Sequence, residues 1–178
     1  MALCPGFSSD NFFVILSDSG KTNIVLYGLF TNFEIMSSST KSKVCFFFKT
    51  PVSLKDRAKL KKFIEAAFRK EKKKLKSLNY IFCDDEELLL INRQYLKHDY
   101  YTDIITFELS SKGEPVEGEV YISIDRVRDD SRRLSLPFYK ELQRVIFHGV
   151  LHLCGYSDRS GQEKKEVRRM EDTLLSEF

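Results

Sequence analysis

One segment near the end of the chain has a strongly helical apolar pattern and contains two of the three histidines. Pro137 suits the first turn of a helix, where a missing N–H costs nothing. Apolar residues then recur at helical spacing, at Leu142, Val145, Ile146, Gly149, Val150 and Leu153. Gly155 can end the helix in the left-handed conformation that helix termini favour. This pattern predicts a buried central helix, against which the other elements must pack.

The two histidines of this segment, His148 and His152, are four residues apart. At that spacing both imidazoles project from one face of a helix and can bind one ion. Asp158 follows the glycine that ends the helix, where an oxygen ligand can complete a set of three. Three protein ligands leave a fourth position for water, whose pKa zinc lowers from about 15.7 to about 7. We therefore predict a catalytic zinc site formed by His148, His152 and Asp158.

Alternatives to this site remain open from sequence. The two histidines can be partly buried helix residues with ordinary hydrogen bonds, although an unsatisfied imidazole on so apolar a helix is costly. His98 is a competing third ligand in a polar loop, and a site without a third protein ligand is a further option. A zinc peptidase of the usual kind needs a glutamate directly after the first histidine, where this chain has Gly149. Peptidase chemistry by that route is therefore disfavoured.

The length of 178 residues fits one globular domain. Hydrophobic residues make up 42% and charged residues 31%, which argues against a disordered or integral membrane protein. No apolar run approaches the roughly 18 to 20 residues of a membrane-spanning helix. The cysteines are scattered, at Cys4, Cys45, Cys83 and Cys154. Without a C-x-x-C pair or an export signal, they predict buried free thiols in a reducing cytoplasm.

The first 43 residues have no regular pattern. Apolar patches at 12–16 and 24–30 are separated by Ser, Asp and Gly, and a polar stretch begins at Met36. We expect Met36 to be the true initiator and residues 1–43 to be an N-terminal extension that is loose or disordered. The alternative is a genuine additional pair of strands. Residues 44–178 then form the functional domain.

Within that domain, strand and helix patterns alternate. Apolar runs of strand length occur at 44–48, 80–83, 104–109 and 120–124. Three further helices are expected from their start signals, which are Ser53 with Asp56, Asp84 with Glu87, and the capping box of Ser160 with Glu163. After the second of these helices the chain is expected to enter a polar loop.

Positive charge is concentrated in residues 55–76. This segment has eleven Lys or Arg against three acidic residues, a local excess of eight in a chain whose formal net charge is +3. The lysines fall on the helix face opposite the apolar residues. Such a surface attracts phosphates, so it is a candidate RNA-guiding surface, although a solvated helix face is the plainer alternative.

Three blocks of this sequence resemble the YbeY-type endoribonucleases, also called rRNA maturation factors. Residues 148–156 are similar to the family mark H-G-x-L-H-L-x-G-Y-D-H. Residues 91–96 and 102–107 are similar to L-N-x-x-Y-R and T-D-V-L-S-F, and residues 118–123 to G-D-I-x-I-S. The blocks occur in the family's order, and the resemblance covers roughly residues 44–175.

The resemblance implies a compact single domain of the α+β class, with a small mixed four-stranded sheet packed with helices and a central buried H-x-x-x-H helix. It implies zinc bound by the histidine motif and cleavage of single-stranded RNA. It further implies a cytoplasmic role in maturation of the 3′ end of small-subunit rRNA and in ribosome quality control. The implied partners are rRNA and the small ribosomal subunit, with no DNA and no membrane.

Two departures from the family pattern affect the site. The family's third histidine aligns with Asp158, and the aspartate before it with Ser157. A carboxylate still suits zinc, but its charge should make the ion a weaker Lewis acid. The family's arginine, which the resemblance assigns to the RNA phosphate, aligns with Leu96. Lys97 and Arg93 are candidate catalytic residues that contact phosphate in its place, with ordinary surface charge as the alternative.

Three other positions have two interpretations each. Thr102 and Asp103 precede a predicted strand, so they either form a turn or orient the loop beside the metal. Tyr156 either packs in the core or belongs to the site. Two other functions also remain open: a zinc hydrolase acting on a small molecule or peptide, and a ribosome-associated RNA-binding protein with a structural zinc.

Overall fold

The computed structural model of this chain describes residues 12–15, 25–26 and 42–178. Met36 and the other residues of the N-terminal extension, apart from 12–15, 25–26 and 42–43, lie outside the described residues. The elements are, in chain order, β1 (Phe12–Ile15), β2 (Val25–Leu26), β3 (Val44–Phe48), α1 (Arg57–Lys70), β4 (Leu75–Cys83), α2 (Asp85–Ile91), the π-helix η1 (Asn92–Leu96), β5 (Ile104–Glu108), β6 (Val116–Ser123), α3 (Ile124–Arg133), α4 (Phe138–Cys154) and α5 (Gly161–Glu177).

The strands form one mixed sheet in the order β2-β1-β5-β6-β4-β3. β3, β4 and β6 run parallel to one another, while β5 is antiparallel to β6. These four strands are the predicted small mixed sheet, although β4 and β6 begin several residues before the predicted segments. β1 pairs antiparallel with β5 and β2 with β1, so two short strands extend the sheet beyond its β5 edge.

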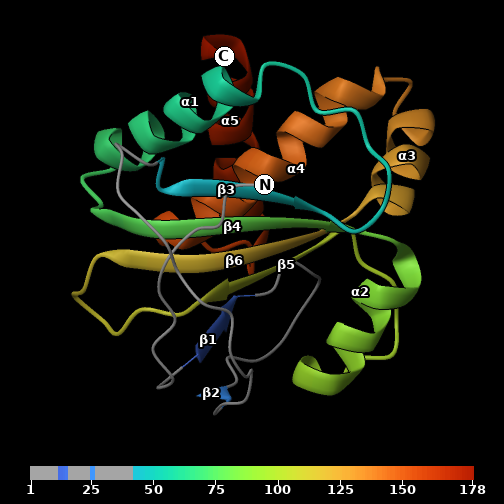
Figure 1. The fold of residues 1–178 in the computed structure, drawn as a ribbon, viewed down its shortest axis with the longest axis horizontal. Helices are drawn as coiled ribbons and strands as arrows, with labels where there is room; N and C mark the ends of the chain where they lie inside the picture. The colour runs from blue at the N-terminus through green and yellow to red at the C-terminus, as the bar shows by residue number, and fades with distance from the viewer. Residues whose placement is uncertain (1–11, 16–24, 27–41) are drawn as a thin grey trace.

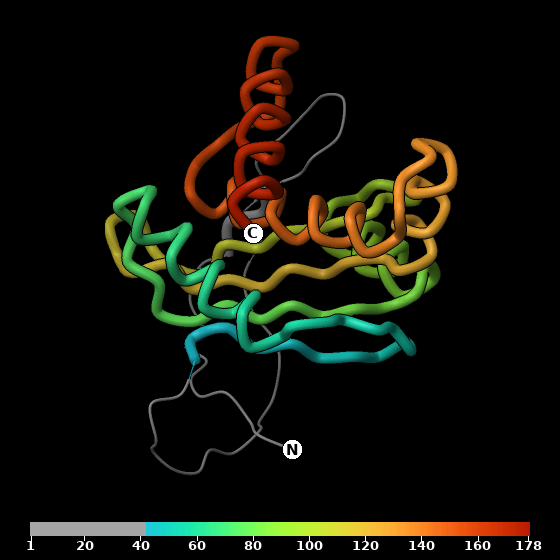
Figure 2. Tube along the Cα trace, turned by 90° about the horizontal axis from the view of Figure 1, so that it is seen from above, coloured from blue at the N-terminus to red at the C-terminus, as the bar shows by residue number. Residues whose placement is uncertain are grey.

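Helices cover both faces of the sheet (Figure 1). On one face, α1 lies over β3 and β4, and α4 lies over β5 and β6. Seen from above, the C-terminal end of α5 lies beside α1, where Lys70 pairs with Glu177 (Figure 2). α2 and η1 lie on the opposite face, where a smaller core cluster forms. This arrangement confirms the α+β fold with the H-x-x-x-H helix, α4, at the centre of the larger core.

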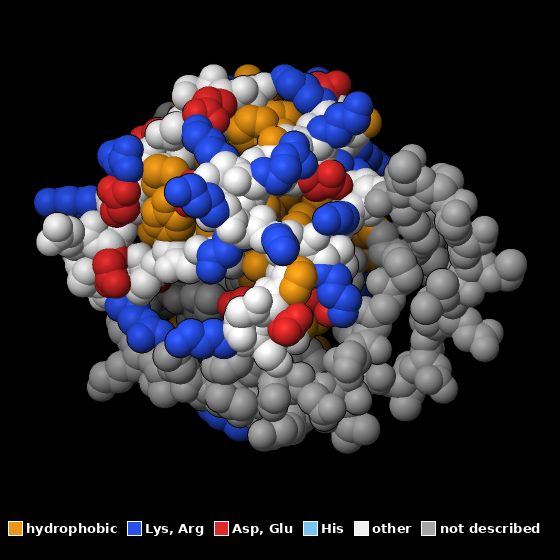
Figure 3. Space-filling model, turned by 90° about the vertical axis from the view of Figure 1, so that its left-hand side faces the viewer, with side chains coloured by type: hydrophobic (Ala, Val, Ile, Leu, Met, Phe, Trp, Pro, Cys, Tyr) orange, Lys and Arg blue, Asp and Glu red, His pale blue; other side chains and the backbone are white. Residues whose placement is uncertain are grey.

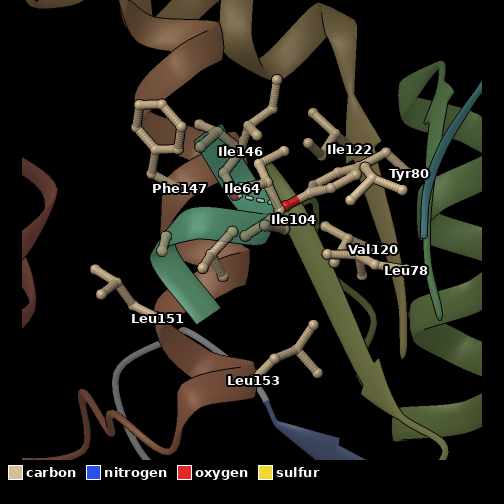
Figure 4. Packing of buried hydrophobic residues seen from close by; sticks show 14 of the residues in the cluster. Ile64, Leu78, Tyr80, Ile104, Val120, Ile122, Ile146, Phe147, Leu151 and Leu153 are labelled. Carbon is tan, nitrogen blue, oxygen red and sulfur yellow. Dashed lines mark hydrogen bonds between the residues drawn. The ribbon is translucent and has the colours of Figure 1, made fainter. Parts of the chain in front are cut away.

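Helix α4 is fixed against the sheet by two close contacts on either side of His148. The buried Tyr80 donates its hydroxyl hydrogen bond to the carbonyl oxygen of Ile146 at 3.0 Å (Figure 4). A Cβ added at Gly149 would lie 3.0 Å from Cγ1 of Val120 on β6. The glutamate that a zinc peptidase carries at this position has no room here, because the β-branched valine cannot swing aside easily.

Several helix ends confirm the predicted start and stop signals. Asp84 caps α2 by accepting a hydrogen bond from the Glu87 amide at 2.9 Å. Both hydrogen bonds of the capping box between Ser160 and Glu163 are present at the start of α5. Gly155 ends α4 with φ 103°, a left-handed backbone that glycine adopts without strain. These short-range signals fix where α4 ends and where the chain turns back toward α5.

Three local predictions differ from the structure. The Ser53 start was wrong, because α1 begins at Arg57 and its cap residue Asp56 is left-handed (φ 50°) without a side-chain cap. The expected polar loop after Ile91 continues instead as η1. Helix α3 was not predicted, because it is mostly charged and buries few apolar side chains. Local signals for α3 are nevertheless present, because Ser123 caps it by accepting from the Arg126 amide at 3.1 Å.

The prediction that the cysteines are buried free thiols is confirmed only in part. Cys83 and Cys154 are free and buried, as predicted. Cys45 is disulfide-bonded, so that part of the prediction was wrong. Positions scattered along a sequence do not show which thiols the fold brings together. Separately, no helix in the described part of the chain is both long enough and apolar enough to cross a membrane.

Candidate metal centre

The structure brings the three predicted ligands together. His148 and His152 come from successive turns of α4, and Asp158 from its connection to α5. Their ligand atoms all lie within 4.8 Å of one another. The two Nε2 atoms are 2.8 Å apart, and the rings are almost perpendicular. His152 and Asp158 are buried, whereas 16% of the His148 side chain is exposed, so the cluster is approached from the His148 side.

The second ring nitrogen of each histidine is already engaged in a hydrogen bond. Nδ1 of His148 lies 2.6 Å from Oε1 of Glu171, and Nδ1 of His152 lies 3.0 Å from the carbonyl oxygen of Tyr156. Because an ionised carboxylate and a carbonyl only accept, each Nδ1 donates, and the Nε2 of a neutral ring keeps its lone pair. Two neutral rings with Nε2 atoms 2.8 Å apart repel unless a proton or a metal cation lies between them. The donor set of two imidazoles and a carboxylate therefore fits a zinc-type cation.

Burial and nearby charge move the pKa values of the two histidines in opposite directions. Burial alone would lower the pKa of His148, but its hydrogen bond to Glu171 and the surrounding carboxylate charges raise that pKa overall. Burial, and then the charge of His148, lowers the pKa of His152 to about 3. His152 is thus neutral at neutral pH, which is the protonation state a metal ligand requires.

Glu171 is a residue of the candidate centre that sequence analysis missed. It is 5% exposed on α5, and its second oxygen, Oε2, lies 3.3 Å from Nη1 of Arg144. The arrangement is the carboxylate–histidine pair that commonly orients a metal-bound imidazole. A signal was present in the sequence, because Glu171 falls between Val167 and Leu174 on the apolar face of its helix. A charged residue at such a position needs a buried partner.

His98, the competing third ligand, lies outside this cluster. Its Nδ1 is 2.9 Å from the hydroxyl of Tyr100, and the two rings stack with centroids 5.1 Å apart. The geometry therefore favours Asp158 as the third ligand.

Comparison with known proteins identifies the family of this chain. Residues 49–178 match the family model described as Endoribonuclease YbeY. The chain belongs to this family. Endoribonuclease YbeY of Cytophaga hutchinsonii is 46% identical over 138 residues, covering 76% of this chain and 96% of that protein. The protein of the same name from Flavobacterium psychrophilum is 40% identical over 135 residues, with the same shares covered.

A solved structure also shares the fold. The solution structure of TM1509 from Thermotoga maritima aligns with a TM-score of 0.53 at 25% sequence identity. The alignment covers 75% of this chain and 90% of that chain. The resemblance to the YbeY family that the three sequence blocks indicated is thus confirmed.

Leu96, which stands where the YbeY family has its arginine, packs in a core cluster. Leu96 is 1% exposed and belongs to the smaller core cluster, on the sheet face opposite α4. Arg93 pairs with Asp99 at 2.6 Å, and the Lys97 ammonium donates to the carbonyl oxygen of Gln94 at 3.1 Å. Both cations are exposed at the surface. Their role as phosphate contacts stays a prediction.

The segment of the YbeY family's second block that enters β5 lies beside His148. The Thr102 hydroxyl donates to the carbonyl oxygen of Ile104 at 3.3 Å, and the Asp103 carbonyl accepts from the Ser123 amide at 2.9 Å. The negative charge of Asp103 also contributes to the raised pKa of His148. Ile104, the next residue, lies against α4 beside His148, since a Cβ added at Gly149 would lie 3.3 Å from its Cδ1. The turn interactions and the proximity to the metal centre are therefore both present.

Tyr156 contributes to the centre through its backbone. Its carbonyl oxygen fixes His152, while its hydroxyl donates to Oε2 of Glu71 at 3.1 Å. Its amide also donates to the carbonyl oxygen of Leu151 at 3.0 Å, in the turn that closes α4. The ring hydroxyl ties this turn to the end of α1, so packing and site roles coexist.

Proposed function

We propose that this chain is a zinc-dependent endoribonuclease that cleaves single-stranded RNA, with zinc held by His148, His152 and Asp158. The observation that carries the proposal is the convergence of two oriented Nε2 atoms and a carboxylate in a member of the endoribonuclease YbeY family. We further propose that it acts in the cytoplasm, on the small ribosomal subunit, in maturation of the 3′ end of small-subunit rRNA.

The side chains around the centre have separate tasks in this reaction, which is attack on a phosphodiester by water or by the adjacent 2′-hydroxyl. When bound, zinc supplies Lewis-acid chemistry, lowering the pKa of water to about 7 and stabilising charge on phosphoryl oxygens. Glu171 and the Tyr156 carbonyl hold the imidazoles in the ligating tautomer. The buried His152 and Asp158 close one side of the centre, so the substrate approaches past His148.

Metal removal tests this function directly. We expect chelation to abolish cleavage of a single-stranded RNA, and added zinc to restore it, because the three ligands are the chain's means of activating the nucleophile. The measurement compares a single-stranded oligonucleotide with its duplex form on a gel, using the untreated, chelated and zinc-restored protein. Binding of RNA by the zinc-loaded protein without any cleavage would contradict the catalytic proposal and favour a structural metal.

The basic segment of residues 55–76 is proposed to guide RNA to the centre. Part of its charge is neutralised, since Lys70 pairs with Glu177 at 2.5 Å and Lys76 with Glu117 at 2.6 Å. Exposed lysines remain in the turn 71–74 after α1. Lys and Arg side chains spread over the face of the molecule on this side, with fewer acidic side chains among them (Figure 3). Phosphates can therefore approach this end of α1 without meeting a continuous acidic surface.

The salt dependence of RNA affinity tests whether these lysines attract RNA phosphates. Changing Lys73 and Lys74 together to Gln is expected to reduce the slope of log Kd against log salt by about 0.7 for each phosphate that these lysines neutralise. The control changes Arg132 and Arg133 to Gln, which removes the same charge from α3 at the other end of the sheet. Equal slopes for the two variants would exclude the turn 71–74 from RNA binding.

A further inference from the structure

The loop between η1 and β5 exposes two adjacent aromatic side chains close to the metal centre. Tyr100 is 39% and Tyr101 45% exposed. Three residues after Tyr101, Ile104 begins β5 against α4, and its Cδ1 lies 3.3 Å from the position of a Cβ added at Gly149, the residue after His148. Exposed aromatic surface of this kind needs an explanation when it lies beside a candidate active site.

Contacts to both neighbouring helices hold the ring of Tyr101 in place. Its hydroxyl donates to Oε1 of Glu86 on α2 at 2.9 Å. The guanidinium carbon of Arg126 on α3 lies 5.0 Å from the ring centroid, within the range of a cation–π contact. Arg126 is itself fixed by its Nε hydrogen bond to Asp85 at 2.8 Å. The ring is thus presented to solvent in an ordered position.

Tyr100 is held in a comparable way. Its ring stacks on that of His98 at an interplanar angle of 22°, and its hydroxyl lies 2.9 Å from the histidine Nδ1. The buried Asn92 donates from Nδ2 to the Tyr100 carbonyl oxygen at 2.8 Å, which anchors the loop backbone to η1. Little conformational entropy remains to be lost when a ligand packs against either ring.

Positive charge accompanies these rings. Arg93 and Lys97 are exposed in the segment just before the loop, and Arg126 lies over Tyr101. Aromatic rings together with Lys and Arg are the combination by which proteins bind single-stranded nucleic acid, with the bases stacking on rings and the backbone attracted by cations. Arg93 already pairs with Asp99 and Arg126 with Asp85, whereas Lys97 takes part in none of the ion pairs among the described residues, so Lys97 is the cation best placed to attract a phosphate.

We propose that Tyr100 and Tyr101 form a stacking platform for unpaired bases of the RNA beside the scissile phosphate. This inference rests on the proposed function, since it takes RNA as the substrate. Every base has a π-face, so the platform tolerates any sequence, whereas bases in a duplex are already stacked on their neighbours. The platform therefore accounts for a preference for single strands that the metal centre alone does not supply.

The test measures stacking directly. A short single-stranded RNA with 2-aminopurine at one position is mixed with zinc-loaded protein, and fluorescence is followed by stopped flow ahead of cleavage. We expect quenching with the wild type and its loss in the Tyr100→Leu, Tyr101→Leu double variant, whose binding should weaken roughly 5- to 150-fold for each base that no longer stacks. Tyr101→Phe keeps the ring and should retain both properties.

The matched control is Tyr139→Leu, which removes a tyrosine that is 53% exposed at the start of α4. Thermal melting and zinc content verify that each variant is folded and metal-loaded. The platform would be overturned if the double variant kept the quenching and the RNA affinity of the wild type, or if Tyr139→Leu lost as much of both. In either case, RNA cleavage by the wild type would leave the proposed function standing. Failure of the wild type to bind or cleave RNA would overturn both.

Discussion

Replacing His152 with alanine is expected to abolish metal binding and RNA cleavage together. His152 is almost fully buried, its Nδ1 is committed to the Tyr156 carbonyl, and its Nε2 faces His148 at 2.8 Å. The variant therefore loses a direct ligand, and its zinc affinity should fall by more than the roughly 10- to 100-fold that loss of an outer hydrogen-bond partner costs. Zinc content after gel filtration and cleavage of a labelled single-stranded RNA measure the two effects.

The third histidine of the chain provides the control. His98→Ala removes an imidazole that stacks on Tyr100 outside the cluster, so zinc content should stay at the wild-type value. Asp158→Ala should behave like His152→Ala. Full zinc occupancy in both the His152 and Asp158 variants would refute the proposed ligand set. Because the His152 change also leaves a cavity, melting of the zinc-free wild type serves as the reference for stability.

Replacing Glu171 with alanine is expected to weaken zinc binding by about 10- to 100-fold and to destabilise the fold. The buried carboxylate accepts from His148 at 2.6 Å and pairs with Arg144 at 3.3 Å, so its loss leaves His148 without its acceptor, while Arg144 keeps Glu141 and Asp172. Leaving a buried donor without its partner typically costs about 1 to 3 kcal/mol. Competition with a fluorescent chelator gives the zinc affinity, and denaturant unfolding of the zinc-free protein gives the free energy of unfolding.

The adjacent residue Asp172 offers a matched comparison. It also pairs with Arg144, at 3.2 Å, but 68% of its side chain is exposed. Asp172→Ala should change the free energy of unfolding by no more than about 0.5 kcal/mol and leave zinc affinity unchanged. Glu171→Gln keeps the shape and an accepting oxygen without the charge, so it should fall between the two. Indistinguishable zinc affinities for the Glu171→Ala and Asp172→Ala variants would exclude Glu171 from the centre.

Features set by short-range chemistry were predictable from the sequence. The spacing of His148 and His152 follows from helical geometry, and Gly155 marks the turn that returns Asp158 to the two rings. The capping box at Ser160 likewise depends on residues three apart. Each of these predictions needed only the preferences of a few neighbouring residues.

Features that depend on distant partners were not predictable in the same way. Glu171 reaches His148 from a helix that begins after the ligand segment, and Arg144 pairs with it across 27 residues. From sequence, Leu96 indicated only that a phosphate-binding arginine is missing, whereas the structure shows it completing a core cluster. The role of Leu96 depends on how η1 packs against one face of the sheet, and the sequence does not show which face that is.

The close fit of α4 against the sheet determines which parts of the protein tolerate amino-acid substitution. Gly149, Val150 and Leu151, between the two histidines, are all buried, so substitution there disturbs the whole interior. Most residues of the two segments next to the centre, 97–103 and 155–160, are exposed or only partly buried. Substitutions in these two segments therefore disturb the interior less than substitutions within α4, and engineering of this enzyme has its freedom there.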